Sequence, residues 1–385
     1  MALLDETKEI LADLIGFPTV SSDSNLELIT YAAERLTAAG ATISIQRDEA
    51  GHKANLLATI GPEIDGGIVL SGHTDVVPAD GEWTSDPFEM REAGGLLYGR
   101  GACDMKGFVA AALAMAPIYA RGDLKRPIHF AFTYDEETGC LGGRQLVEEL
   151  KRMQMKPSTA IIGEPTGMGI IEGHKGCFEY TTEFTGLEGH GSQPDLGVNA
   201  VEYAVRYIAR LMELGEAMKP RAPKGSRFDP PWTTVQVGRI EGGTARNVIA
   251  GRCAVEWEMR PVRTEDADDI KSQLHAYCRH DLLPAMRAVS PEADIVTHTI
   301  GEVAGLEPVS DNEARTIVTE LTGSNEAGVV AFGTEAGLFQ EIGMSAVICG
   351  PGSIEQAHKP DEYVSVTQLQ HCLDMLTGLN GRLRA

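Results

Sequence analysis

Three apolar runs in the first half of the chain each end in a side chain that can bind a metal ion. They are Ile68-Val-Leu-Ser-Gly-His73, Ile128-His-Phe-Ala-Phe-Thr-Tyr-Asp-Glu-Glu137 and Ala160-Ile-Ile-Gly-Glu164. Short apolar runs of this kind, bounded by turn residues, predict buried strands. Open α/β sheets bind ligands beyond the carboxyl ends of their strands, so the runs predict one shared pocket at that edge of a sheet.

Helical and strand patterns alternate through most of the chain. Helices are expected over residues 3–16, 25–40, 105–120, 311–321 and 366–383, and strands over 41–46, 55–60, 67–70, 127–133, 159–162, 329–332 and 346–349. Strands that alternate with helices predict an α/β domain, here with a mixed sheet and helices on both of its faces.

The pattern changes between residues 176 and 298. A strand over 178–184, a helix over 198–214, strands over 233–240 and 251–260, a helix over 265–280 and a strand over 293–299 follow one another. This βαββαβ order is typical of a ferredoxin-like α+β unit. We therefore expect one domain made of residues 1–175 and 299–385, with a second domain, residues 176–298, inserted into it.

Composition excludes several classes of function. The 385 residues include 33 Lys and Arg against 56 Asp and Glu, a formal net charge of −23. Nucleic acids and anionic membranes are bound mainly through basic patches, so neither is an expected partner. We expect no membrane span and no signal peptide, because no apolar run approaches ~20 residues and no basic segment precedes one. Seven cysteines without a C-x-x-C pair favour a reducing compartment, the cytoplasm.

Two further residues join the three strand ends as possible metal ligands. Asp104 is flanked by glycines at a predicted helix start, and His358 follows the strand expected over 346–349. Carboxylates buried together repel one another unless a cation compensates their charge. Three carboxylates and two imidazoles suit a divalent metal, zinc first, and a carboxylate shared by two ions about 3.5–4 Å apart is a common arrangement.

Four segments resemble the M20 metallopeptidase/deacylase family, in the order that the family uses. They are Ser71-Gly-His-Thr-Asp-Val-Val-Pro78, Gly99-Arg-Gly-Ala-Cys-Asp-Met-Lys-Gly107, Thr133-Tyr-Asp-Glu-Glu-Thr-Gly139 and Gly163-Glu-Pro-Thr166. The resemblance implies a dinuclear-metal catalytic domain with a zinc ion on His73 and Glu164, a second on Glu137 and His358, and Asp104 bridging them. Cobalt and manganese remain alternatives, because the same ligands bind all three.

The resemblance also implies roles for two acids beside these ligands. Asp75 matches the acid that supports the ligating histidine, which usually donates its second N–H to such a group. Glu136 matches the general base, which takes a proton from the metal-bridging water and passes it to the leaving amine. Such assistance contributes roughly 10²–10⁴ in rate.

The inserted domain resembles the lid and dimerisation module of the family, so a homodimer is expected. In Gly186-Leu-Glu-Gly-His190-Gly-Ser-Gln-Pro, His190 matches the histidine that reaches the partner subunit's site and stabilises the oxyanion. The family usually has Ser after this histidine, and this chain has Gly191. The alternative is that His190 is an ordinary residue of a surface loop.

Several polar residues match positions that contact substrate. In the inserted domain, Asn247 and Arg260 match family contacts, whereas Arg260 pairing with Glu256 or Glu258 is the structural alternative. Lys175 is a further candidate or only a strand cap. Nearer the C-terminus, the backbone N–H of Gly333 and the hydroxyl of Thr334 could bind the substrate carboxylate. Glu335 could face a cationic side chain of the substrate, or it could only support the site.

The stretch from residue 332 to residue 363 looks most like that of the acetylornithine deacetylases within this family. The resemblance implies a small-molecule N-acyl amino acid as substrate and hydrolysis of its amide bond. Succinyl-diaminopimelate desuccinylases, aminoacylases and dipeptidases are alternatives with the same mechanism. A non-catalytic metal-binding scaffold is the alternative of another class, which an intact Glu136 disfavours.

Overall fold

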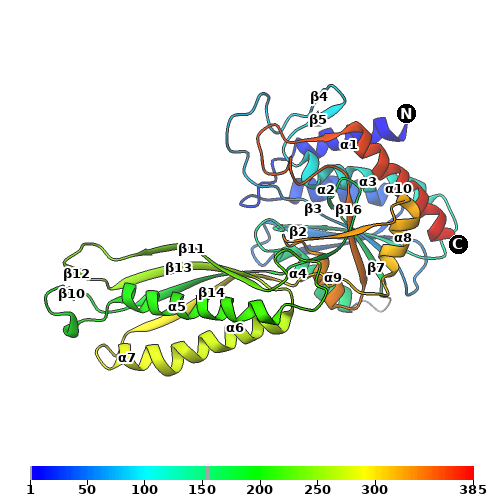
Figure 1. Ribbon diagram of the computed structural model, residues 1–385. Helices are drawn as coiled ribbons and strands as arrows, with labels where there is room; N and C mark the ends of the chain where they lie inside the picture. The colour runs from blue at the N-terminus through cyan, green and yellow to red at the C-terminus, as the bar shows by residue number, and fades with distance from the viewer. Residues whose placement is uncertain (1, 153–155) are drawn as a thin grey trace. The chain divides into compact units, whose positions relative to one another are not determined.

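The structure, a computed structural model, describes residues 2–152 and 156–385 and divides the chain into two units (Figure 1). Unit 1 is Met1–Gly173, Pro308–Val329 and Thr334–Ala385, and unit 2 is His174–Glu307 and Val330–Gly333. The expected boundary at residue 298 falls inside strand β14 (Asp294–Val303), so the inserted segment continues to Glu307.

Unit 1 is built on a mixed sheet, as expected. Within the described residues the sheet has eight strands in the order β1-β2-β6-β3-β7-β16-β8-β15. β6, β3, β7 and β16 run parallel, whereas β1 pairs antiparallel with β2, β2 with β6 and β8 with β16. The strands are β1 (Thr42–Arg47), β2 (Ala54–Ile60), β3 (Ile68–His73), β6 (Ile128–Thr133), β7 (Thr159–Pro165), β8 (Ile170–His174), β15 (Ala327–Val330) and β16 (Ser345–Gly350).

Helices cover both faces of this sheet, and a small antiparallel sheet, β17-β5-β4, accompanies it (Figure 1). The helices are α1 (Leu3–Ile15), α2 (Leu26–Ala38), α3 (Gly107–Ala120), α4 (Leu141–Arg152), α8 (Glu313–Thr322), α9 (Ala336–Glu341) and α10 (Val366–Arg384). The small strands are β4 (Arg91–Ala93), β5 (Leu96–Tyr98) and β17 (Tyr363–Ser365).

Helix α3 lies at the centre of unit 1, against α1, α2 and α10. Its Ala-rich sequence is apolar on every side, which is typical of a helix buried all round. With the preceding turn (Ala102–Lys106) it is, by length and composition only, long and apolar enough to cross a membrane. However, 89% of that stretch is buried inside the protein, as in the core helix of a folded domain.

One glycine sets the distance between α3 and the sheet. A β-carbon added at Gly163 in β7 would lie only 1.9 Å from Cγ of Phe108 in α3. Phe108 is fully buried, so it has no room to move away. A glycine here therefore lets α3 approach the strand that carries Glu164 at the next position.

Unit 2 has the ferredoxin-like βαββαβ order that the sequence predicts. Its sheet order is β11-β13-β9-β14, and α5 and α6 cover one face (Figure 1). On that face Tyr180 stacks on Trp257 with ring centroids 4.4 Å apart. The elements are β9 (Cys177–Thr185), β10 (Gly189–His190), α5 (Ala200–Met218), β11 (Thr234–Gly242), β12 (Val248–Ile249), β13 (Arg252–Arg260), α6 (Thr264–Tyr277), α7 (Leu283–Arg287) and β14.

Candidate metal centre

Two groups of side chains in unit 1 can each hold a metal ion. The first is His73, Asp104 and Glu164, and the second is Asp104, Glu137 and His358; within each group the ligand atoms lie within 4.8 Å of one another. These are the five residues expected as ligands, and the structure brings them together in the expected pairs.

Asp104 belongs to both groups because its two carboxylate oxygens face different histidines. Oδ1 lies 3.0 Å from Nε2 of His73, and Oδ2 lies 3.3 Å from Nε2 of His358. On the outer sides, Nε2 of His73 is 3.7 Å from Oε1 of Glu164, and Nε2 of His358 is 3.1 Å from Oε1 of Glu137. A carboxylate placed between two histidines in this way could bridge two metal ions.

The parallel strands explain why these residues meet. His73 ends β3 opposite Thr133, the last residue of β6, so the loop that carries Glu137 leaves the sheet beside His73. Glu164 lies near the end of β7, which is parallel to β3 on its other side. All three ligands therefore lie at the carboxyl edge of the sheet, where α/β sheets place their sites.

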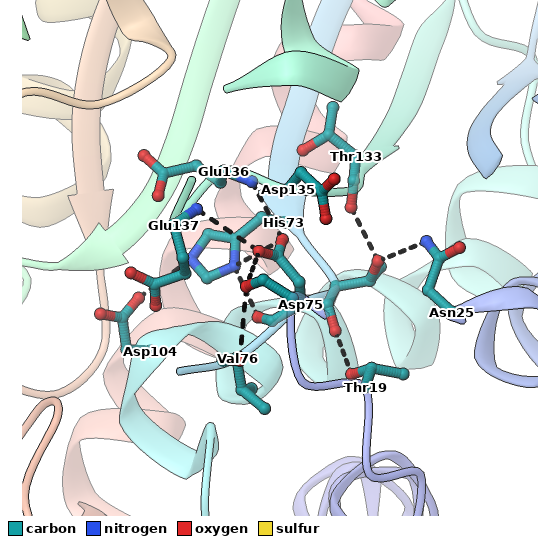
Figure 2. Close-up of polar contacts among 12 residues, drawn as sticks. Thr19, Asn25, His73, Asp75, Val76, Asp104, Thr133, Asp135, Glu136 and Glu137 are labelled. Atoms are coloured by element: carbon teal, nitrogen blue, oxygen red, sulfur yellow. Dashed lines mark hydrogen bonds and ion pairs between the residues drawn. The ribbon is translucent and has the colours of Figure 1, made fainter. Parts of the chain in front are cut away.

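Asp75 holds the backbone of the loop that follows β6 (Figure 2). Its Oδ1 accepts the amide N–H of Glu136 at 3.1 Å, its Oδ2 accepts that of Glu137 at 3.4 Å, and Oδ2 also accepts the hydroxyl of Ser21 at 2.7 Å. The Nδ1 of His73 contacts the backbone oxygen of Asp75 at 2.9 Å, nearer than Oδ1 at 3.6 Å. The expected support of the histidine by this acid thus comes first from its main chain.

Glu136 lies outside both ligand groups. Figure 2 shows the side chain of Glu137 beside Asp104 and that of Glu136 directed elsewhere. Burial and the charge of Glu137 raise the pKa of Glu136 well above its ordinary value. A carboxylate with a raised pKa, close to the ligands but not one of them, is suited to accept a proton.

The charges of the cluster fit a bound cation. Burial and the charge of Asp104 raise the pKa values of Glu137 and Glu164, and hydrogen bonds with Asp104 and Glu137 raise the pKa of His358 to about 10. Oε1 of Glu164 is buried, and within the described residues it has no hydrogen-bond partner. Divalent metal ions take such nitrogen and oxygen ligands and would satisfy this oxygen.

Glu335 and Thr334 lie behind the strand ends and are already engaged. Glu335 is 1% exposed, and its two oxygens accept the hydroxyls of Ser71 at 2.5 Å and Thr133 at 2.9 Å. The hydroxyl of Thr334 accepts the backbone N–H of Ala336 at 3.1 Å. Of the two roles considered for Glu335, this placement fits support of the strands that carry His73 and the Glu136 loop.

In unit 2 the structure brings His190 and Asn247 together. β10 pairs with β12, and the N–H of Gly191 donates to the backbone oxygen of Asn247 at 2.8 Å. Both side chains are exposed. A β-carbon at residue 191 would lie 2.9 Å from that oxygen, so the glycine that replaces the usual Ser permits this close approach.

The other candidates of unit 2 already have partners. Arg260 donates to Glu258 at 2.6 Å, which is the structural alternative considered above. Lys175 is 1% exposed and donates to the backbone oxygen of Trp232 at 2.9 Å. Gly333 is packed against Cys177, whose Cβ would lie 3.1 Å from a β-carbon at residue 333.

Sequence reasoning missed two residues that organise the site, Ser21 and Glu362. Ser21 bonds to Asp75, 54 residues later in the chain, and Glu362 binds the backbone of the Asp104 loop, 258 residues earlier. Both act over sequence distances that no local pattern reports. Glu362 follows His358 within one recognised stretch, and this closeness was the only available signal.

The fold and this site define a metal-dependent hydrolase. Residues 69–380 match the family described as peptidase family M20/M25/M40, and the chain belongs to this family. Among curated proteins, it is 38% identical over 375 residues to the acetylornithine deacetylase of Myxococcus xanthus, covering 96% of this chain and 95% of that protein. It is 35% identical over 376 residues to the acetylornithine deacetylase of Proteus mirabilis (strain HI4320), covering 96% and 94%.

Solved structures share the fold at lower sequence identity. The M20 family metallo-carboxypeptidase Sso-CP2 from Sulfolobus solfataricus matches with a TM-score of 0.75 at 19% identity, covering 99% of both chains. The YXEP protein of Bacillus subtilis, described as a dinuclear metal binding peptidase from the M20 family, matches with a TM-score of 0.64 at 16% identity, covering 100% of this chain and 99% of that one. The family match and the curated relatives confirm the family resemblance in the sequence, and the solved structures share the fold.

Proposed function

We propose that this protein hydrolyses the amide bond of N²-acetyl-L-ornithine, giving L-ornithine and acetate in arginine biosynthesis. The observation that carries the proposal is the pair of ligand groups joined by Asp104, in a chain similar over 96% of its length to acetylornithine deacetylases. In this reaction water adds its oxygen to the acetyl carbon, and the amide nitrogen leaves with a proton.

The metal ligands are His73 and Glu164 on one side, Glu137 and His358 on the other, and Asp104 between them. Zinc is our first choice, with two ions per subunit, and cobalt or manganese would fit the same ligands. A pair of divalent ions held there supplies positive charge that makes a water molecule acidic enough to react at neutral pH.

Glu136 is the proton carrier in this proposal. Its carboxylate accepts one proton of the attacking water, and the same proton then passes to the leaving amine, so the residue ends as it began. The hydrogen bonds from its own backbone and that of Glu137 to Asp75 support this role, since they fix the loop that carries it.

Unit 2 is the lid and dimerisation unit in this proposal, and the protein is a cytoplasmic homodimer. His190 would stabilise the oxyanion from the partner subunit, with Asn247 and Arg260 contacting polar groups of the substrate. The exposed position of His190 on the β10–β12 ribbon supports a role toward another molecule. The free thiols of Cys103, Cys140, Cys253, Cys278, Cys349 and Cys372 are consistent with a reducing compartment.

The test is release of free amine by the zinc-loaded protein from a panel of amides. The panel holds N-acetylornithine, N-acetylmethionine, N-succinyl-diaminopimelate and a dipeptide, with Glu136→Gln as the control variant. We expect acetylornithine to have the highest kcat/KM and the control to lose roughly 10²–10⁴ in kcat on it. If the protein prefers another amide, the proposed substrate is wrong and the proposed hydrolytic mechanism stands. Absence of turnover on every amide, with metal bound, would favour the scaffold alternative.

A further inference from the structure

One buried carboxylate, that of Glu362, binds the loop that carries Asp104. Its Oε1 accepts the backbone N–H groups of Cys103 at 2.9 Å and Asp104 at 3.0 Å. Its Oε2 accepts the backbone N–H of Gly101 at 3.1 Å and the guanidinium of Arg100 at 2.7 Å. Glu362 is 1% exposed, and each of its oxygens has two donors. Bonds of this charge-assisted kind are the stronger ones in proteins, so they fix the loop firmly.

Strand pairing places Glu362 beside this loop. β17 begins with Tyr363, which lies opposite Tyr98 at the end of β5, and the N–H of Gly99 donates to the backbone oxygen of Glu362 at 3.0 Å. The segment that enters β17 carries His358, four residues before Glu362, and the loop that leaves β5 carries Asp104. Glu362 therefore joins the segments that supply two ligands of the second group.

The guanidinium of Arg100, which donates to Glu362, is itself held in place by other contacts. Arg100 is 2% exposed, and its Nη2 donates to the backbone oxygen of Pro78 at 3.0 Å. Its guanidinium also lies over the ring of Trp83, 5.0 Å from the centroid. A neutral side chain at position 362 would leave this buried charge without its carboxylate, which is costly in a protein interior.

Glu362 belongs to neither of the two ligand groups. Its oxygens accept N–H groups, so any effect on a metal ion passes through Asp104 and not through direct contact. Asp104 has the most exacting position of the five ligands, because both of its oxygens must face a histidine at once. A small rotation of its backbone would move Oδ1 and Oδ2 together and weaken both groups.

We propose that Glu362 is a positioning residue of the metal centre, which fixes the backbone of Asp104 so that this carboxylate can serve two metal ions. The inference rests on the proposed function only in requiring that the two ligand groups bind metal. Removal of a group that orients a metal ligand typically lowers the metal affinity 10–100-fold.

The test is a titration of the metal-free protein with zinc in the presence of a competing chelator, recorded by calorimetry, which gives the affinity for each zinc ion. Glu362→Gln keeps the side-chain shape but turns an NH₂ group toward two N–H donors. Glu172→Gln is the matched control, because Glu172 is 5% exposed, lies in the same unit and accepts Arg315 at 2.6 Å. We expect about 10–100-fold weaker binding of both zinc ions in Glu362→Gln, and wild-type affinity in Glu172→Gln.

The outcomes separate this inference from the proposed function. Failure of the wild-type protein to bind zinc would overturn the metal centre, and the inference with it. Two zinc ions on the wild type and equal affinity in Glu362→Gln would overturn the inference alone, as would an equal loss in Glu172→Gln. If Glu362→Gln does not fold, Glu362→Asp decides: it keeps the charge but is one methylene too short to reach all four donors, and wild-type affinity in it would also overturn the inference.

Discussion

The side-chain carboxylate of Asp75 accepts the backbone N–H of Glu136 at 3.1 Å (Figure 2). The same carboxylate accepts the hydroxyl of Ser21 at 2.7 Å. Asp75 therefore controls the direction from which the Glu136 side chain leaves the loop, in addition to its contact with His73. Asp75 thus contacts both His73, a metal ligand, and Glu136, the proposed proton carrier.

Replacing Asp75 by Asn should lower kcat about 10–100-fold. The amide NH₂ of Asn cannot accept the N–H groups that the carboxylate accepts, so the loop shifts. Ser21→Ala removes one hydroxyl, which donates to Asp75 at 2.7 Å and contacts the backbone oxygen of Val76 at 3.4 Å. It should cost about 1 kcal/mol of the free energy of unfolding with little effect on kcat. Steady-state kinetics and urea unfolding of both variants check this. Equal kcat values for the wild type and Asp75→Asn would contradict it.

Glu136→Gln and Glu137→Gln should differ in kind, although the residues are neighbours. Glu136→Gln should keep its metal and lose roughly 10²–10⁴ in kcat, because only the proton carrier is removed. Glu137→Gln should lose metal, because this residue is 3.1 Å from His358 in the second ligand group. Metal analysis after dialysis, combined with kinetics, distinguishes them. Loss of metal from both variants would show that Glu136 is a ligand.

The number of ions lost should depend on which carboxylate is changed. Asp104→Asn should lower the affinity for both metal ions, since Asp104 contacts both histidines. Glu164→Gln should lower the affinity for one ion and leave that for the other unchanged, because Glu164 belongs to the first group only. Calorimetric titration with zinc gives the number of sites and their affinities. One weakened site in both variants would contradict a bridging role for Asp104.

Glu335→Gln should change the kinetics of cationic and neutral substrates alike. The carboxylate is buried, and both of its oxygens are bonded to hydroxyls, so it supports β3 and β6 and has no free oxygen for an ammonium group. We expect kcat/KM for N-acetylornithine and N-acetylmethionine to fall by the same factor. A selective rise of KM for N-acetylornithine would instead show that Glu335 contacts the cationic side chain.

Acid should destabilise the metal-free protein partly through His129. This residue is 3% exposed, and burial lowers its pKa from 6.5 to about 4. Between these pH values the unfolded chain binds a proton that the folded protein does not, so stability falls as pH decreases from 6.5. At about pH 4 the loss approaches about 3 kcal/mol, from about 1.4 kcal/mol per pKa unit.

Urea unfolding at several pH values between 7 and 4.5 measures this effect. His129→Gln should show a shallower decrease in the free energy of unfolding than the wild type. The control is a matching change at His174, a buried histidine of unit 2 whose pKa burial also lowers to about 4. That variant should keep the contribution of His129. The same slope in wild type and His129→Gln would refute the prediction.

The sequence predicted the strands that end in ligands better than it predicted their supports. The runs before His73, Glu137 and Glu164 are apolar and short, and each becomes a buried strand. Helix α4 was not predicted, and its Gly142 and Gly143 are poor helix formers. Close packing explains the first of them, since a β-carbon at Gly142 would lie 2.5 Å from Oδ1 of Asn55.

Roles that depend on contacts between distant residues were the hardest to predict. The sequence left open whether Arg260 pairs with Glu258 or stays free for substrate, and only the folded unit shows the 2.6 Å pair. The bonds of Glu335 and Glu362 likewise join segments far apart in the chain. Motifs identify which residue types are present, whereas the strand pairings decide which backbone groups those residues reach.

The insertion of unit 2 has a consequence for how the protein is made. β16 pairs with β7 in the middle of the unit 1 sheet, although the whole of His174–Glu307 is translated between them. A ribosome therefore exposes nearly all of unit 2 while the unit 1 sheet still lacks this strand and the second ligand group lacks His358. Domains generally fold as units during synthesis. Unit 2, which carries none of the five ligands His73, Asp104, Glu137, Glu164 and His358, can thus fold first. The nascent chain gains this complete ligand set only when its last segment emerges.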